Sequence, residues 1–319
     1  MKLHSRTPLV LHRELSTPEQ RIWLKLENLQ PCGSYKLRGI GALCQHAHLQ
    51  GKRKLIAPSG GNAGIAAAYA GRELGMAVEV IVPKTTPEAT RARIRSIGAD
   101  VLVFGEAWDE SNQLALERAQ ADDAQYVPAF DHPLIWEGHS TLIDEIVDEL
   151  PTVDAIVASV GGGGLLSGIL LGLDRYRRND CRVIAVETEG AASFHAALEA
   201  GRPVNIGRIT SIAKSLGALQ VAQWPVDAIR EVPHASIVLS DAEAIAGTIR
   251  YADEARQLVE PACGVSLAVA YQHHRCLDGA QDVVVIVCGG VSISATQIAA
   301  WKAEQAGNSG CAQRAPAIP

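Results

Sequence analysis

The chain has 319 residues, about twice the roughly 150 that one globular domain usually takes, so two domains are the starting expectation. Hydrophobic residues make up 47% and charged residues 20%, which is typical of folded proteins and excludes a largely disordered chain. Acidic residues outnumber basic ones, 35 to 29, and the Lys and Arg residues are scattered. This charge pattern argues against a nucleic-acid partner.

Segments rich in Val and Ile alternate with Ala-rich helical patterns along most of the chain. Repeated strand and helix pairs predict an α/β protein, with parallel sheets covered by helices. Helices are predicted to start at Asn62 and after Thr86-Pro87, and Gly98 is a predicted helix C-cap. The predicted pairs are 55–59 with 63–75, 78–83 with 86–98, 100–105 with 110–123, 155–164 with 165–178, 182–187 with 193–201, and 282–290 with 293–305.

Two stretches, 155–173 and 283–301, carry no charge for 19 residues each, which is nearly the length of a membrane span. Glycine and serine interrupt both stretches, so we interpret each as a buried strand, a glycine turn and a helix. The N-terminus has charges every few residues and no apolar signal core. We therefore expect a cytoplasmic protein that does not bind a membrane.

The seven cysteines form no CxxC pair, and the ten histidines form no HExxH motif. We expect reduced, mostly buried thiols and no transition-metal site.

The predicted units fall into a smaller and a larger part of the chain. We predict a large domain made of residues 1–38 and 137–305, and a small domain over residues 39–136. Residues 306–319 are rich in Gly, Ala and Pro and are predicted to form a disordered tail. A cleft between the two domains is the expected ligand site.

A run of four glycines, 161–164, follows a predicted strand and opens a helix. Backbone N–H groups at a helix N-terminus can approach an anion closely where side chains are absent, so this loop predicts a phosphate site. A Walker loop is excluded, because two leucines stand where Lys and Ser or Thr are required. A dinucleotide fingerprint stays open as an alternative, although Ser167 replaces its third glycine; Glu187 ends the next strand, where that motif needs an acidic residue.

A second loop, 59–64, also joins a strand to a helix and suits a carboxylate, and a third glycine loop, 288–290, ends another strand. Lys36 lies between Gly33 and Gly39. A lysine is most often a solvated surface residue, but a desolvated lysine is an amine nucleophile that forms a Schiff base with an aldehyde. Together with a phosphate loop, this chemistry indicates pyridoxal phosphate.

The features above belong to long motifs: KLENLQPCGSYKLRG at 25–39, SGGNAG at 59–64, PKTTP at 83–87, FDHPLIWEGH at 130–139, SVGGGGLLSG at 159–168, ETEGAASFHAA at 187–197, VEPACG at 259–264 and VIVCGG at 285–290. In this order they resemble the serine/threonine dehydratases of the tryptophan-synthase-β type, which are fold type II pyridoxal-phosphate enzymes. The resemblance extends to about Trp301 and is closest to the catabolic L-serine dehydratases. It implies two domains with parallel-rich sheets flanked by helices, and an active site in the interdomain cleft.

The resemblance also implies an activity: β-elimination that converts L-serine to pyruvate and ammonia, and L-threonine to 2-oxobutyrate, in a homodimer. Lys36 would be the catalytic residue, forming the Schiff base and removing the α-proton. The implied cofactor-binding residues are Tyr35 and Lys36 at the ring and aldehyde, Asn62 at the 3′ oxygen, Gly161, Gly162, Gly163, Gly164 and Leu165 at the phosphate, and Cys288 at the pyridine nitrogen. The implied substrate-carboxylate loop is Ser59, Gly60, Gly61, Asn62 and Ala63.

Two of these positions shape the expected chemistry. A thiol at Cys288 is a weak, neutral partner for the ring nitrogen, which favours elimination over transamination. Gly60 stands where serine racemases of this fold have a Ser that transfers a proton, so we expect little racemisation. The resemblance further implies a monovalent-cation site, for which hard oxygen ligands suit K⁺. Its implied ligands are Glu187, Ala191 and Ser193 with the carbonyl groups of Gly161, Leu216 and Ala218.

Several alternatives stay open at this point. The substrate could be a β-hydroxy amino acid bulkier than serine, or the protein could be another fold type II lyase or synthase. A dinucleotide-dependent dehydrogenase leaves Lys36 and the 59–64 loop unexplained. A non-catalytic amino-acid-binding regulator of the same fold is disfavoured by the intact Lys36.

Overall fold

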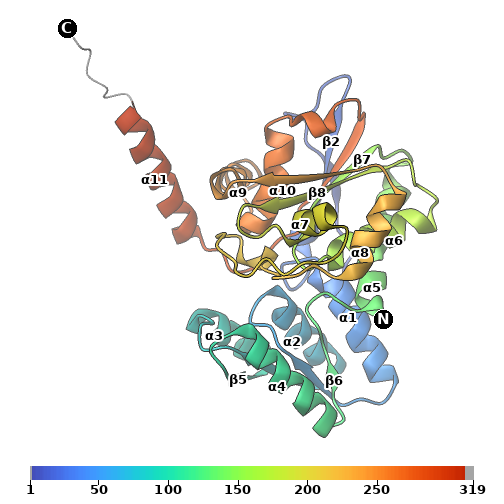
Figure 1. The fold of residues 1–319 in the computed structure, drawn as a ribbon, viewed down its shortest axis with the longest axis vertical. Coiled ribbons are helices and arrows are strands. Elements are labelled where there is room, and N and C mark those ends of the chain that lie inside the picture. The colour runs from blue at the N-terminus through green and yellow to red at the C-terminus, as the bar shows by residue number, and fades with distance from the viewer. Residues whose placement is uncertain (1, 313–319) are drawn as a thin grey trace.

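The computed structural model describes residues 2–312 and, within them, the side chains of residues 2–305. Two sheets lie in separate halves of the molecule, as Figure 1 shows. The larger sheet has six strands in the order β1-β2-β10-β7-β8-β9, which are parallel except where β1 meets β2. Its strands are β1 (Leu9–Leu11), β2 (Arg21–Lys25), β7 (Ala155–Ser159), β8 (Arg182–Thr188), β9 (His234–Leu239) and β10 (Asp282–Ile286).

Strands β7, β8 and β10 form the centre of the larger sheet and are buried almost throughout. An unpaired charge is costly in a parallel strand that is covered on both faces, which accounts for the lack of charge over β7 and β10. Strand β7 leads into α6 (Gly164–Arg175), and β10 precedes α11 (Ala295–Ala312). No helix in the described part of the chain is both long enough and apolar enough to cross a bilayer.

Helix α10 (Pro261–Tyr271) packs on β7, β8 and β10, and α9 (Asp241–Ala255) packs on α10. A capping box starts α9, in which the side chains of Ser240 and Glu243 each accept from the other residue's backbone N–H. The remaining helices of this half are α7 (Ser193–Ala200) and α8 (Gln223–Ala228), with the 3-10 turns η1 (Glu27–Leu29), η2 (Lys214–Leu216), η3 (Ile229–Glu231) and η4 (Arg275–Leu277).

The smaller sheet has four parallel strands in the order β5-β4-β3-β6. As predicted, α2 begins at Asn62, and Gly98 ends α3 in the left-handed conformation. The elements of this half are β3 (Lys54–Ala57), α2 (Asn62–Leu74), β4 (Ala77–Val82), α3 (Glu88–Ile97), β5 (Asp100–Val103), α4 (Trp108–Ala121) and β6 (Gln125–Tyr126).

Two further helices, α1 (Lys36–Leu49) and α5 (Pro133–Glu149), pack against each other where the halves meet. Helix α5 serves both cores, because Ile135 packs in the core of the smaller half and Ile143 in that of the larger. The predicted domain boundaries, 38/39 and 136/137, fall inside these two helices. These boundaries stay a prediction.

Helix α11 projects away from the larger half (Figure 1). The sequence predicted a disordered tail from residue 306, but the helix continues to Ala312. Good helix formers, Lys, Ala, Glu and Gln, occupy residues 302–305 and carry the helix up to the predicted start of the tail. The rest of the predicted tail, 313–319, lies outside the described residues.

Candidate active site

Lys36 is the first residue of α1, and the turn before it is held by the end of β10. The backbone N–H of Tyr35 donates to the Cys288 carbonyl at 3.1 Å, and the N–H of Gly290 donates to the Gly33 carbonyl at 3.0 Å. A Cβ on Gly289 would lie 2.4 Å from the Gly33 oxygen, so this approach requires glycine. The third glycine loop of the sequence therefore positions the start of the lysine helix.

The amine of Lys36 lies over the Tyr35 ring, 5.3 Å from its centroid, and donates to the carbonyl oxygen of Ala129 at 2.5 Å. Burial lowers the pKa of Lys36 to about 8. A substantial fraction of this amine is neutral near physiological pH, as a nucleophile or a base must be.

The glycine run lies between Phe130 and the segment that follows η2. An ideal Cβ would come within 2.3 Å of the Phe130 ring at Gly162, and within 2.8 Å of Pro225 at Gly163. Within the described part of the chain, the backbone N–H groups of residues 161–165 have no hydrogen-bond acceptor. Because they lie at the N-terminus of α6, where the helix dipole is positive, they form a site for an anion such as a phosphate.

The 59–64 loop ends β3 and starts α2. A Cβ on Gly64 would lie 1.7 Å from the Ser59 carbonyl oxygen, so the tight turn requires glycine there. The backbone N–H groups of Asn62 and Ala63, at the N-terminus of α2, have no acceptor among the described residues. This arrangement can bind a carboxylate.

Asn62 connects the two halves of the molecule. Its Nδ2 lies 3.2 and 3.3 Å from the carboxylate oxygens of Glu260 and 3.4 Å from Ser215 Oγ, while its Oδ1 accepts from the Val291 N–H at 3.2 Å. Sequence reasoning did not select Glu260 as a site residue. The only signal was its place in the VEPACG motif.

Cys288 lies next to both the lysine turn and the glycine run. The residue is 6% exposed, and its Sγ lies 3.6 Å from Oγ of Ser159, at the end of β7. The buried Cys263 is its neighbour, and burial raises the pKa of the Cys263 thiol well above its usual range. Both are free thiols, as predicted.

His139 is a second residue that the sequence did not single out. Its ring lies 4.9 Å from the Tyr35 ring, centroid to centroid, and is fully buried. Neither ring nitrogen has a hydrogen-bond partner in the described structure. Burial, with the positive charges of Lys36 and Arg38, holds the pKa of His139 well below its usual range, so the ring is neutral.

The predicted cation residues lie around the end of β8. The Glu187 carboxylate is fully buried and accepts from the backbone N–H groups of Phe194 and His195 at 2.9 and 2.7 Å. Burial raises the pKa of Glu187 to about 8. The buried Ser193 Oγ has no partner among the described residues. From the other side, Gly161 meets Leu216, since a Cβ on Gly161 would lie 3.0 Å from the Leu216 Cα.

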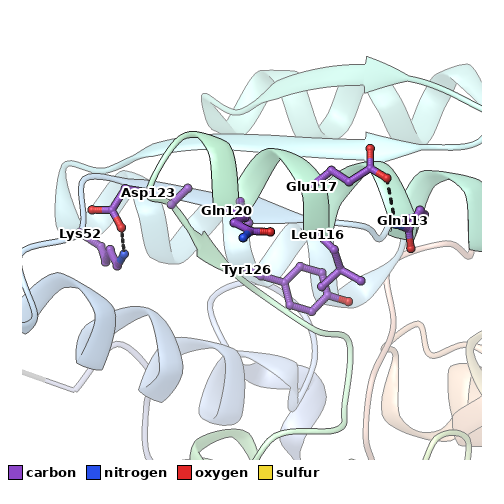
Figure 2. A pocket seen from close by; sticks show the side chains of 9 residues that line it. Lys52, Gln113, Leu116, Glu117, Gln120, Asp123 and Tyr126 are labelled. Carbon is purple, nitrogen blue, oxygen red and sulfur yellow. Dashed lines mark hydrogen bonds and ion pairs between the residues drawn. The ribbon is translucent and has the colours of Figure 1, made fainter.

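These contacts bring the predicted site residues together. Lys36 donates to Ala129, and Phe130, the residue after Ala129, packs on the 161–164 glycine run. Cys288 contacts both the turn before Lys36 and the end of β7. A separate groove on helix α4 contains none of these residues (Figure 2). That groove is lined by Lys52, Gln113, Leu116, Glu117, Ala119, Gln120, Asp123, Ala124 and Tyr126.

The model of one protein family, described as pyridoxal-phosphate dependent enzyme, matches residues 1–289. The chain belongs to this family. A serine dehydratase-like protein of Mus musculus is 45% identical over 305 residues, covering 92% of this chain and 93% of that protein. An L-serine dehydratase/L-threonine deaminase of Homo sapiens is 44% identical over 316 residues, covering 96% of each chain. The crystal structure of a fungal L-serine ammonia-lyase from Rhizomucor miehei matches with a TM-score of 0.89 and 35% identity, covering 95% of this chain and 99% of that one.

Membership of this family confirms the predicted fold type II architecture and sets aside the dinucleotide alternative. The residues present fit pyridoxal phosphate. The unpaired N–H groups of residues 161–165 suit its phosphate, and the Lys36 amine, with its lowered pKa, suits its aldehyde. Ser167, at the third glycine position of the dinucleotide fingerprint, donates instead to the Gly163 carbonyl at 2.9 Å.

Proposed function

We propose that this pyridoxal-phosphate enzyme is an ammonia-lyase that converts L-serine to pyruvate and ammonia, and L-threonine to 2-oxobutyrate and ammonia. The observation that carries the proposal is the convergence on one site of a partly buried lysine amine, a thiol and a glycine run whose N–H groups have no acceptor among the described residues. The relatives named for serine dehydration and threonine deamination, which match along nearly the whole chain, support it.

The family's cofactor, when bound, withdraws electrons from the substrate's Cα and so acidifies its proton. Lys36 Nζ would hold the aldehyde carbon of the cofactor and would also be the atom that takes the substrate's α-proton. Its pKa of about 8 suits an amine that alternates between base and acid near neutral pH. Tyr35 would lie against the ring, and the N–H groups of residues 161–165 would bind the phosphate.

The Cys288 thiol would face the ring nitrogen. The 59–63 loop would hold the substrate carboxylate with the N–H groups at the start of α2, which places Cα and Cβ near the base. The reaction then balances: Lys36 takes the α-proton and returns a proton to the β-hydroxyl, which leaves as water, and one water molecule hydrolyses the resulting enamine, through its imine tautomer, to the keto acid and ammonia. Gly60 carries no group that could return a proton to the opposite face, so we expect elimination without racemisation.

We also propose a K⁺ site at the Glu187 loop. A fully buried carboxylate lies in the element next in the chain to that of the Ser193 hydroxyl, which has no hydrogen-bond partner among the described side chains, and the proposed carbonyl ligands Gly161 and Leu216 are in contact with each other. Oxygen ligands of this kind suit a hard monovalent cation. We further propose that the protein is a cytoplasmic homodimer and that its domain boundaries lie at 38/39 and 136/137.

A substrate panel tests this function. The protein loaded with pyridoxal phosphate is incubated with L-serine, D-serine, L-threonine and bulkier β-hydroxy amino acids, and keto acid and ammonia are both measured. We expect equal amounts of the two products from L-serine, less from L-threonine, and none from the Lys36→Ala variant. Cofactor binding without keto acid from any substrate would instead support a non-catalytic regulator. Faster turnover of a bulkier amino acid would change the assigned substrate.

A further inference from the structure

Glu260 is a buried carboxylate that none of the steps above uses. Its residue is only 3% exposed, and no ion-pair partner lies within 4 Å among the described residues. It stands at the start of α10, yet its side chain makes no capping hydrogen bond to that helix. Helix capping, the usual role of a carboxylate just before a helix, therefore does not explain Glu260.

The carboxylate instead joins three other segments. Its Oε1 accepts from the backbone N–H of Ser292 at 2.9 Å and from Ser292 Oγ at 2.5 Å. Its Oε2 accepts from Ser215 Oγ, and both oxygens lie within reach of Asn62 Nδ2. A buried carboxyl group without an ion-pair partner depends on such hydrogen bonds, so these donors hold the Glu260 side chain in this hub.

The backbone makes room for this hub. Gly290 adopts a φ of +119°, and a Cβ there would lie 2.2 Å from the Glu260 carboxyl carbon and 2.6 Å from Oε2. Any side chain at residue 290 would therefore displace the carboxylate. Gly290 also donates to Gly33 in the lysine turn, so the hub lies directly beside the segment that presents Lys36.

The hub determines the orientation of the Asn62 amide. The Val291 N–H can only donate, so the amide oxygen Oδ1 of Asn62 must face it. The carboxylate of Glu260 can only accept, so the amide nitrogen Nδ2 must face Glu260. One Nδ2 hydrogen then points to Glu260, and the second faces Ser215 Oγ across a long contact of 3.4 Å that a ligand can replace. We propose that Glu260 is a positioning residue that orients Asn62 toward the 3′ oxygen of the cofactor. This inference rests on the proposed contact between Asn62 and the cofactor.

Equilibrium titration of the cofactor-free protein with pyridoxal phosphate tests the inference without any substrate, so its result is independent of the proposed reaction. In Glu260→Gln one acceptor oxygen becomes a donor that faces Asn62 or Ser215, and we expect at least tenfold weaker cofactor binding. Asn62→Ala should weaken binding similarly. The double variant should bind no more weakly than Asn62→Ala alone, because both changes remove one interaction.

Glu243→Gln is the matched control, since Glu243 also accepts from the N–H and Oγ of one serine, Ser240, but at the start of α9. We expect it to lower thermal stability and leave cofactor affinity unchanged. Should Glu260→Gln not fold, Glu260→Asp keeps the charge but shortens its reach to Asn62, and the same loss of affinity is expected. Unchanged affinity in either Glu260 variant, or effects of Glu260→Gln and Asn62→Ala that simply add, would overturn the inference.

Discussion

Replacing Gly60 with Ser probes both the packing and the chemistry of the substrate loop. An ideal Cβ at this position would lie 2.7 Å from Thr86 Cγ2, 3.2 Å from Thr86 Oγ1 and 3.2 Å from Val82 Cγ1. Carbon atoms normally approach to about 3.5–4.0 Å, so the Thr86 methyl group must move by about 1 Å or the side chain must rotate. Thr86 therefore occupies the space that a side chain at residue 60 would need.

This geometry sets bounds on the unfolding free energy that Gly60→Ser would lose. An off-rotamer side chain costs about 0.5–1.5 kcal/mol, and overpacking typically costs about 1–3 kcal/mol. We expect Gly60→Ser to lose roughly 1–2 kcal/mol, which lowers Tm by a few degrees, at about 2–4 °C per kcal/mol for a protein of this size class. The double variant Gly60→Ser/Thr86→Ala, which removes both close Thr86 atoms, should recover most of this loss, with Thr86→Ala alone as its control.

The catalytic outcome is measured on the same variants. Chiral analysis of the L-serine reaction should detect D-serine from the double variant, whose introduced serine hydroxyl can transfer a proton, and none from the unmodified protein. Abundant D-serine from the unmodified protein would refute the argument that Gly60 prevents racemisation. A Gly60→Ser variant as stable as the unmodified protein would refute the steric argument.

Three further predictions concern the cofactor and cation sites. The rate of pyridoxal-phosphate incorporation into the cofactor-free protein should rise with pH and level off above about 8, since only neutral Lys36 attacks the aldehyde; a midpoint near 10 in a stopped-flow absorbance measurement would contradict the lowered pKa. In Gly162→Ala the new Cβ would lie 2.3 Å from the Phe130 ring, so the variant should lose about 1–3 kcal/mol of unfolding free energy and bind the cofactor at least tenfold more weakly. Denaturant unfolding measures the first effect and titration with pyridoxal phosphate the second. Normal affinity would show that the loop does not hold the phosphate. K⁺ should raise the Tm of the unmodified protein but not of Glu187→Gln; an equal rise in both would place the cation elsewhere.

Local patterns predicted the strand and helix units well. The alternation of Val-rich and Ala-rich segments identified β3 through α4 and β7 through α7, because hydrophobic periodicity and turn glycines are read within a few residues. Other elements were not predicted, including α1, α5 and α9, although the capping box of α9 is a local signal. Two more had no clear signal. Helix α10 is buried nearly all round and so has no polar face, and β6 has only two residues at the edge of its sheet.

Contiguous motifs in the sequence were enough to single out the candidate reactive groups: an amine at Lys36, glycine loops after buried strands, and a thiol at Cys288. The residues that contact these groups became visible only in the folded structure. Glu260 orients Asn62 from a distant segment, Ala129 accepts from Lys36, and the unpaired His139 lies against Tyr35. Contacts between residues far apart in the chain depend on how helices and loops pack, and a single sequence does not encode that packing in any local pattern.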